Sequence, residues 1–351
     1  MEERSRSKKK EKDLLERLRQ SSPAAIAGAF VSFASAATGA QPKPPVRPEP
    51  DPSLVQISLS EARPVRAPIR LELEYRQAQA LGAAKFRRSL QGISIGPGDT
   101  IFALGDGEVK VLKPDGTTLE AWKAPEGAAC IAAGRDDRIY IGRKGRVEGF
   151  DGKGKHRGGF GAGDPGRPAD VTAVKLFGRE LLVADAAARL IRRCDLNGKQ
   201  LGTIGAWNKV KGFMLPNGAL DLDVDSKGIV AAADPGRHRV TLWNLDGSLI
   251  GHFGKFGLAS PGDFVGCCNP VNLAFAPDGR IVVSEKVAGR VKVYDRAGKL
   301  LAVIGPEHFD PKCARLHLAV DSKGRILVAD PVRLEIKVFS LAGPPGGRED
   351  V

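Results

Sequence analysis

The sequence is poor in aromatic residues and lacks the short motifs of several enzyme classes. Only 6% of its 351 residues are Phe, Trp or Tyr. No basic stripe interleaved with stacking side chains is present, so the usual signature of a nucleic-acid binder is missing. No C-x-x-C, H-E-x-x-H, P-loop or C-x-x-C-H motif occurs. The zinc protease, NTPase and c-type haem classes therefore lose their usual support, and we expect nucleic acid not to be a partner.

Glycine and proline, in contrast, are abundant. The chain has 43 Gly and 24 Pro without a collagen-like period, which indicates many tight turns and an all-β class. Apolar residues make up 42% and charged residues 27% of the sequence, as expected for a protein with a buried core. The formal net charge of +13 favours anionic partners electrostatically.

The N-terminal part has the order of an export signal. Residues 1–22 form a basic charged segment, 23–40 an apolar signal or anchor segment without charges, and 41–66 a proline-rich linker. Small residues at Ala34–Ala36 or Thr38–Ala40 would suit a signal peptidase. We expect a periplasmic or other extracytoplasmic location, with the body secreted or tethered to a membrane; the alternative is an Ala-rich lead-in to a cytosolic chain.

Six similar segments follow, each with apolar alternating runs separated by turns. They are Gly92–Trp122, Cys130–Gly161, Thr172–Gly205, Asp221–Gly254, Asn272–Gly305 and His317–Gly343. Hairpins such as Asp246-Gly247 and Asn197-Gly198 precede the last run of a segment, and these pairs tolerate the positive φ of two-residue hairpins. A repeat of four short strands at this period predicts a six-bladed β-propeller.

The frame D-S-K-G followed by A-D, seen from Asp225 and again from Asp321, resembles the NHL-repeat family. The resemblance implies a propeller fold and carries no reaction with it. The run Cys267-Cys268-Asn269-Pro270, together with Ser284–Lys286, looks like a bacterial subset of that family without assigned activity.

The sixth segment lacks a fourth strand. The alternating run Ile69–Tyr75 precedes the first blade, and we expect it to pair with the third strand of the last blade around Lys337–Phe339 and close the ring. The propeller would then span residues 67–345, followed by a tail at 346–351. Because the ring is complete within one chain, we expect a monomer.

The first strand of each blade lines the central channel of a propeller, and the position before its first core residue is mostly polar here. The candidate ligand residues at these positions are Cys130, Thr172, Asp221, Asn272 and His317. Asp221, Asn272 and His317 are the residues that a divalent metal would need. No cofactor is expected otherwise.

An acidic residue ends the second strand in blades three to six. These residues are Asp185, Asp234, Glu285 and Asp330. Because Arg239 and Arg290 follow five positions after two of them, we interpret this ring as structural ion pairs.

The five cysteines are the most distinctive residues. Cys268 and Cys313 are each four residues before an equivalent first-strand position, so we expect them to be neighbours at one mouth of the channel. An interblade disulfide between them would suit an oxidising compartment. A vicinal Cys267–Cys268 disulfide, reduced buried thiols, and a redox or metal site built from all three remain alternatives.

These observations leave three functions open. The first is a non-catalytic recognition or scaffold propeller outside the cytoplasm that binds a protein or an anionic glycan. The second is a metal-dependent hydrolase or lyase with a channel-bound divalent ion, as the resemblance to gluconolactonase-like and amidating-lyase-like propellers implies. The third is a redox accessory protein that uses the clustered cysteines.

Overall fold

The computed structural model describes residues 71–81, 86–134, 136–206, 212–310, 312–313 and 315–342. These residues all belong to one unit of the chain, Pro68–Val351. The three segments expected in residues 1–66 and the tail at 346–351 lie outside the described residues. Among the described residues, no helix has the length and hydrophobicity that a transmembrane span requires.

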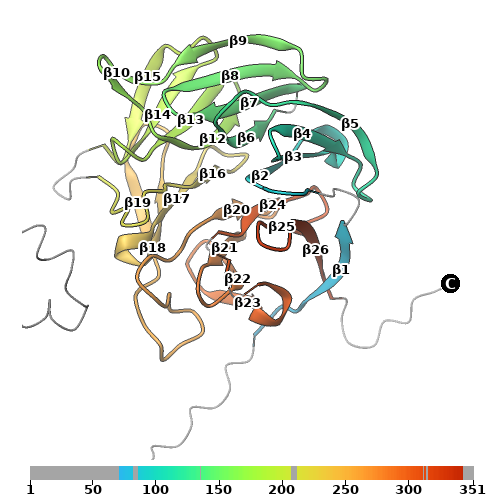
Figure 1. The fold of residues 1–351 in the computed structure, drawn as a ribbon. Coiled ribbons are helices and arrows are strands. Elements are labelled where there is room, and N and C mark those ends of the chain that lie inside the picture. The colour runs from blue at the N-terminus through green and yellow to red at the C-terminus, as the bar shows by residue number, and fades with distance from the viewer. Residues whose placement is uncertain are drawn as a thin grey trace, which may run out of the picture. The chain divides into compact units, whose positions relative to one another are not determined.

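The described residues form six four-stranded antiparallel sheets, each one blade of a propeller (Figure 1). Blade 1 contains β2 (Gly92–Ile95), β3 (Ile101–Gly105), β4 (Glu108–Leu112) and β5 (Thr118–Lys123). Blade 2 contains β6 (Ala128–Ala133), β7 (Arg138–Arg143), β8 (Arg146–Asp151) and β9 (His156–Gly161). Blade 3 contains β12 (Val171–Phe177), β13 (Glu180–Asp185), β14 (Leu190–Asp195) and β15 (Gln200–Ile204).

The last three blades repeat this order. Blade 4 contains β16 (Leu222–Val224), β17 (Val230–Asp234), β18 (Arg239–Trp243) and β19 (Leu249–Phe253). Blade 5 contains β20 (Leu273–Phe275), β21 (Ile281–Glu285), β22 (Arg290–Tyr294) and β23 (Leu300–Ile304). Blade 6 contains β24 (His317–Val320), β25 (Ile326–Asp330) and β26 (Glu335–Leu341). The six-bladed all-β fold predicted from the repeats is therefore confirmed.

Burial changes across each blade and explains its sequence. The first strands β2, β6, β12, β16, β20 and β24 face the middle of the ring in Figure 1. Second strands such as β17 and β25 are buried at every position, whereas the outer strand β5 is mostly exposed. Apolar side chains of neighbouring blades pack together, as Val240 of blade 4 does in one cluster with Leu273 of blade 5. The core therefore lies between the blades.

Glycine in the outer hairpins allows neighbouring blades to approach. Gly198, in the β14–β15 hairpin, has φ = 90°, and a Cβ there would lie 2.3 Å from Cγ of Phe160 in blade 2. Both the left-handed conformation and the contact require glycine at this position.

The ring is closed by an N-terminal strand, but not by the run that the alternation predicted. β1 (Tyr75–Leu81) pairs antiparallel with β26, with Tyr75 opposite Leu341 and Leu81 opposite Ile336 (Figure 1). Residues 71–74 are not in a strand, so the predicted strand Ile69–Tyr75 is wrong in position. β1 is an outer strand with mostly exposed residues, so hydrophobic alternation does not mark it.

A short hairpin between blades 2 and 3 was not expected from the repeats. β10 (Gly163–Asp164) pairs with β11 (Arg167–Pro168). Its carboxylate at Asp164 contacts Arg192 of blade 3 with a separation of 2.9 Å, so the hairpin is joined to the blade that follows it.

Candidate functional site

The predicted channel positions meet around one small cavity. They are Gly92, Cys130, Thr172, Asp221, Asn272 and His317. The repeat alignment therefore brought the correct residues together, and their role as ligands stays a prediction. The cavity measures about 40 Å³, which leaves room for water and not for an organic substrate.

Two acidic residues of blade 4, Asp221 just before β16 and Asp223 within it, join blade 4 to blade 5 inside the channel. The Oδ2 atom of Asp221 accepts hydrogen bonds from Asn272 Nδ2 and from the backbone N–H of Leu273, each at 3.0 Å. Asp223 Oδ2 accepts the backbone N–H of Phe275 at 2.8 Å. Burial raises the pKa of Asp221 above its ordinary value. The carboxylates of Asp221 and Asp223 therefore stabilise the contact between blades 4 and 5.

Among the described channel residues, one buried polar side-chain atom has no protein partner. The Oδ1 atom of Asn272 is buried and accepts no hydrogen bond from the described residues. Because the amide nitrogen is already directed at Asp221, the oxygen is available to a donor in the cavity. A single water molecule meets that requirement.

Lys175 is the channel residue that the sequence analysis missed. Its Nζ lies 3.3 Å from Asp223 Oδ1. Burial alone would lower the pKa of Lys175, but the attraction of Asp223 and Asp221 outweighs burial and raises that pKa. The signal was available, since Lys175 is the only charged residue in the otherwise largely apolar strand β12.

The other channel side chains are held in neutral forms. Burial, assisted by the Arg315 charge, lowers the pKa of His317 to about 4. Burial also raises the pKa of Cys130 to about 12. Thr172 Oγ1 donates to the carbonyl of Leu220 at 2.7 Å and so joins blades 3 and 4. At neutral pH these three side chains thus contribute no net charge to the channel.

The residues do not favour a divalent ion in the channel. Within the described ranges, no group of three or more His, Cys, Asp or Glu side chains is arranged to hold a metal. The Lys175 ammonium already lies beside Asp223 and is attracted to Asp221, so a divalent cation would have to displace it.

A serine motif in blade 1 does not form a nucleophile site. The segment Gly92–Gly96 matches G-x-S-x-G, a pattern that carries chemistry only on a strand-to-helix turn. Ser94 lies inside β2 instead, and its Oγ accepts the backbone N–H of Ala133 in the next blade at 2.9 Å. This serine therefore links two blades.

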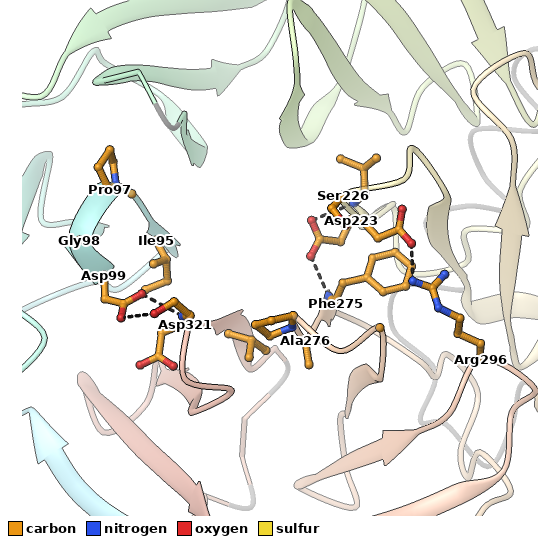
Figure 2. Close-up of a pocket in the computed structure, with 17 residues that line it drawn as sticks. Ile95, Pro97, Gly98, Asp99, Asp223, Ser226, Phe275, Ala276, Arg296 and Asp321 are labelled. Carbon is orange, nitrogen blue, oxygen red and sulfur yellow. Dashed lines mark hydrogen bonds and ion pairs between the residues drawn. The ribbon is translucent and has the colours of Figure 1, made fainter.

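A wider hollow of about 690 Å³ opens at the other end of the first strands (Figure 2). It is lined by the turns between first and second strands in blades 1, 4, 5 and 6. Asp99 accepts hydrogen bonds from Ser322 N and Oγ, and Arg296 pairs with Asp225. Asp223 and Asp321 pair with Lys175 and Arg325. The lining contains four carboxylates and one arginine, so the hollow is predominantly acidic.

The predicted acidic ring has the structural contacts expected of it. Asp234 Oδ2 pairs with Arg239 at 3.1 Å, and Glu285 pairs with Arg290 and, at 3.0 Å, with Lys292. Burial lowers the pKa of Lys292 to about 8.

The remaining two acids of this ring use different partners. Asp185 pairs at 2.9 Å with Arg192, seven residues downstream. Asp330 accepts the backbone N–H groups of Val332 and Arg333, each at 2.9 Å. Burial alone would raise the pKa of Asp330, but these hydrogen bonds hold it below its ordinary value. The acids therefore organise the turn after the second strand.

The predicted Cys268–Cys313 disulfide is absent, because all five cysteines are free thiols in the structure. Cys313 Sγ donates to Asp330 Oδ1 of its own blade at 3.1 Å, and burial raises the pKa of Cys313 to about 12. Cys268 Sγ instead lies 3.1 Å from Cys267 Sγ. Equivalent positions in neighbouring blades thus have local partners. The expected proximity of Cys268 and Cys313 stays a prediction.

In each blade, the loop that leads into the first strand and the turn between the second and third strands lie at the same end of the strands. We call this end of the propeller the long-loop face. An apolar patch, defined as Met214, Phe256 and Leu258, lies in these loops at blade 4. Leu258 is 83% exposed, Phe256 59% and Met214 48%. The Phe256 ring centroid lies 5.1 Å from that of His238 in a tilted contact. The Met214 carbonyl accepts Gly236 N–H, so both residues contact the same turn.

The long-loop face also carries an excess of positive charge. Its exposed basic residues in the described connections are Arg87, Arg88, Lys144, Arg167, Arg189, Lys255, Lys312 and Arg333. Its exposed acidic residues are Glu126, Asp164, Asp170 and Glu307. This face therefore combines exposed apolar side chains with an attraction for negative charge.

Comparison with known proteins identifies the fold of this chain and does not identify its family. No family model and no curated protein matches this chain, so the NHL resemblance stays a prediction. A streptogramin B lyase structure aligns with a TM-score of 0.56 and 10% identity, covering 78% of this chain and 100% of that one.

Two further solved structures extend the range of neighbours. The WD40 propeller domain of Doa1 aligns with a TM-score of 0.53 and 14% identity over 76% of this chain and 97% of that one. A chain of the mitotic checkpoint complex aligns with a TM-score of 0.54 and 12% identity, covering 79% of this chain and 95% of that one. The neighbours thus include a lyase, a WD40 propeller domain and a chain of a protein complex, and what they share with this chain is the β-propeller fold.

Proposed function

We propose that the protein is a non-catalytic recognition propeller that binds an acidic partner protein on its long-loop face. The observation that carries the proposal is the apolar patch of Met214, Phe256 and Leu258 on a face with a surplus of basic side chains. Exposed apolar side chains supply affinity at such surfaces, and complementary charge supplies the association rate and the choice of partner.

The channel supports this proposal by offering little to a substrate. Its cavity of about 40 Å³ is far below the roughly 300–1,000 Å³ of ordinary ligand sites. Asp221 is engaged with Asn272 and Leu273, and Asp223 with Lys175 and Phe275. A channel-bound catalytic metal has less support from these residues than recognition on the outer face has.

We place this recognition outside the cytoplasm, with the propeller acting as a monomer. Support for the location comes from the sequence, where a basic segment precedes the uncharged run 23–40 and a proline-rich linker follows. Support for the monomer comes from β1, which pairs with β26 of the same chain and completes the sixth blade.

The test compares two probes on the full chain: short peptides rich in Asp and Glu, with and without Phe and Leu, and heparin as an anionic glycan. We expect the peptides that combine acidic and apolar residues to bind best. The double substitution Phe256→Ser with Leu258→Ser should weaken that binding about tenfold, or about 1.4 kcal/mol.

The matched control replaces exposed residues of the opposite face, Ser226→Asn with Lys323→Gln, and should bind as the wild type does. Binding of heparin alone, unaffected by the patch substitutions and lost at high salt, would show a glycan site instead. Equal loss in the patch variant and the control would contradict the proposed surface.

A further inference from the structure

Two adjacent thiols are presented on the long-loop face, in the loop that leads from blade 4 into blade 5. Cys267 is exposed and Cys268 is buried, and their Sγ atoms lie 3.1 Å apart. One thiol is therefore accessible to a reagent from solvent, while the other lies in contact with it from the protein side.

The loop that carries the pair is anchored by the residue that follows it. Asn269 is fully buried. Its Nδ2 donates to the carbonyls of Val265 and Lys286, and its Oδ1 accepts the backbone N–H of Lys286 at 2.9 Å. The two hydrogen bonds with Lys286 connect the cysteine loop to the end of β21, and the bond to Val265 holds the loop itself, so the two thiols and Lys286 keep a defined arrangement.

The charge distribution distinguishes the two sulfur atoms. The hydrogen bond from Cys268 and the nearby Lys286 charge lower the pKa of Cys267. Burial and the interaction with Cys267 raise the pKa of Cys268, although Lys286 acts against them. The exposed sulfur is thus the better thiolate and the buried one keeps its proton, which is the division between an attacking and a resolving thiol.

The other three cysteines have the opposite character. Cys130, Cys194 and Cys313 are all buried. Burial raises the pKa of each of these thiols. They are therefore poor nucleophiles, and a thiol reagent should react first at Cys267 and Cys268.

We propose that Cys267 and Cys268 form a reactive dithiol that exchanges with an accessible disulfide. The Cys267 thiolate attacks one sulfur of the disulfide R–S–S–R, forming a mixed disulfide and releasing R–S⁻. Cys268 then loses its proton to solvent, and its sulfur attacks Cys267 Sγ and releases the second R–S⁻. The protein pair is oxidised by two electrons, and the external disulfide is reduced to two thiols. No partner protein is needed, so the inference stands apart from the recognition proposal.

The experiment uses the reduced full chain with less than one equivalent of dithionitrobenzoate, an aromatic disulfide whose thiolate is coloured. We expect two coloured thiolates for each reagent molecule consumed, and an intact mass lower than that of the reduced chain by two hydrogens. Cys268→Ser should release one thiolate and retain the aromatic adduct on Cys267. Cys267→Ser should react more slowly than the wild type.

Two further variants test the cause of the reactivity. Lys286→Met should slow the first step about threefold for each unit by which the pKa of Cys267 rises, because the tenfold loss of thiolate is partly offset by greater nucleophilicity. Cys194→Ala, which removes a buried thiol, should behave as the wild type. A wild-type protein that stops at the mixed disulfide, with one thiolate released, would overturn the proposal, as would equal rates in the wild type and Cys267→Ser.

Discussion

Lys175 is the residue on which the charge balance of the channel depends. Asp221 precedes β16 and Asp223 lies within it. Both accept backbone hydrogen bonds from β20 and so connect blades 4 and 5. Lys175 reaches them from blade 3. A single ammonium group therefore compensates two acidic side chains and connects three consecutive blades.

Substitution of Lys175 by Met should lower the free energy of unfolding by about 2–4 kcal/mol at neutral pH, because two largely buried carboxyl groups lose their cation. Urea denaturation of the purified protein measures this. The control is Lys227→Met, at an exposed lysine in the turn between β16 and β17 of blade 4. Its free energy of unfolding should stay within about 0.5 kcal/mol of the wild-type value. Similar losses in both variants would argue against the ion pairs.

His317 should make stability depend on pH in a defined window. Its folded pKa of about 4 lies below the unfolded value of about 6.5. As the pH falls from 6.5 to 4, the unfolded chain therefore takes up a proton that the folded chain does not, and stability decreases by up to about 3 kcal/mol. Above and below this window the contribution of His317 is constant.

His317→Gln removes this titration, so the wild type should lose stability relative to the variant between pH 6.5 and pH 4 and not outside that range. Arg315 and the cavity groups Asp221, Lys175 and Cys130 are common to both proteins, and their own titration largely cancels in the difference. Denaturation curves across this range give the result, and a difference that is independent of pH would show that His317 is not held neutral.

At the scale of the element, β1 acts as the fourth strand of the last blade. Tyr75 packs in the cluster between blades 5 and 6, and Leu81 packs in the cluster that joins blade 6 to blade 1. The strand thus supplies hydrogen bonds to β26 and apolar side chains to both neighbouring interfaces.

Leu81→Ala should cost about 2–5 kcal/mol of unfolding free energy, because Leu81 is 1% exposed and truncation leaves a cavity. Gln77→Ala, at an exposed residue of the same strand, should cost less than about 0.5 kcal/mol. Deletion of residues 1–81 should destabilise the ring more than either substitution, since β26 would become an open edge. Equal stability of the two point variants would mean that β1 does not seal the ring.

The sequence predicted the blades well because their inner strands repeat without gaps. Leu273–Phe275 and Leu318–Val320 align directly, so the channel positions before them were assigned correctly. The outer strand β1 is mostly exposed and follows no strict hydrophobic alternation, which is why the closing strand was placed several residues too early. Lys175 was missed because the repeats were compared only at the position before the first core residue of each inner strand, and Lys175 lies farther along β12.

The cysteine prediction failed for a related reason. Alignment showed that Cys268 and Cys313 are equivalent, but a disulfide depends on where each loop directs its sulfur. Cys313 is directed to Asp330, and Cys268 to Cys267. Contacts within one loop or one blade cannot be derived from the comparison of repeats.

For the whole molecule, the location of the propeller is the prediction with the widest consequence. A reporter that is active only in an oxidising compartment, fused after residue 66, should be active if the run 23–40 directs export. The same fusion with Phe30→Lys and Val31→Lys, which interrupts the apolar run, should be inactive. An inactive reporter in the unchanged fusion, recovered from the cytosol, would place the propeller inside the cell.

The pairing of β1 with β26 also determines when the protein can finish folding. Tyr75 lies opposite Leu341. The strand of the ring that is synthesised first therefore cannot pair with β26 until nearly all of the blades have been synthesised. Until then the growing chain exposes two unpaired edges and the apolar seams beside them. Ring closure is therefore a late event of biogenesis, and a chain interrupted anywhere before β26 lacks the partner for its own first strand.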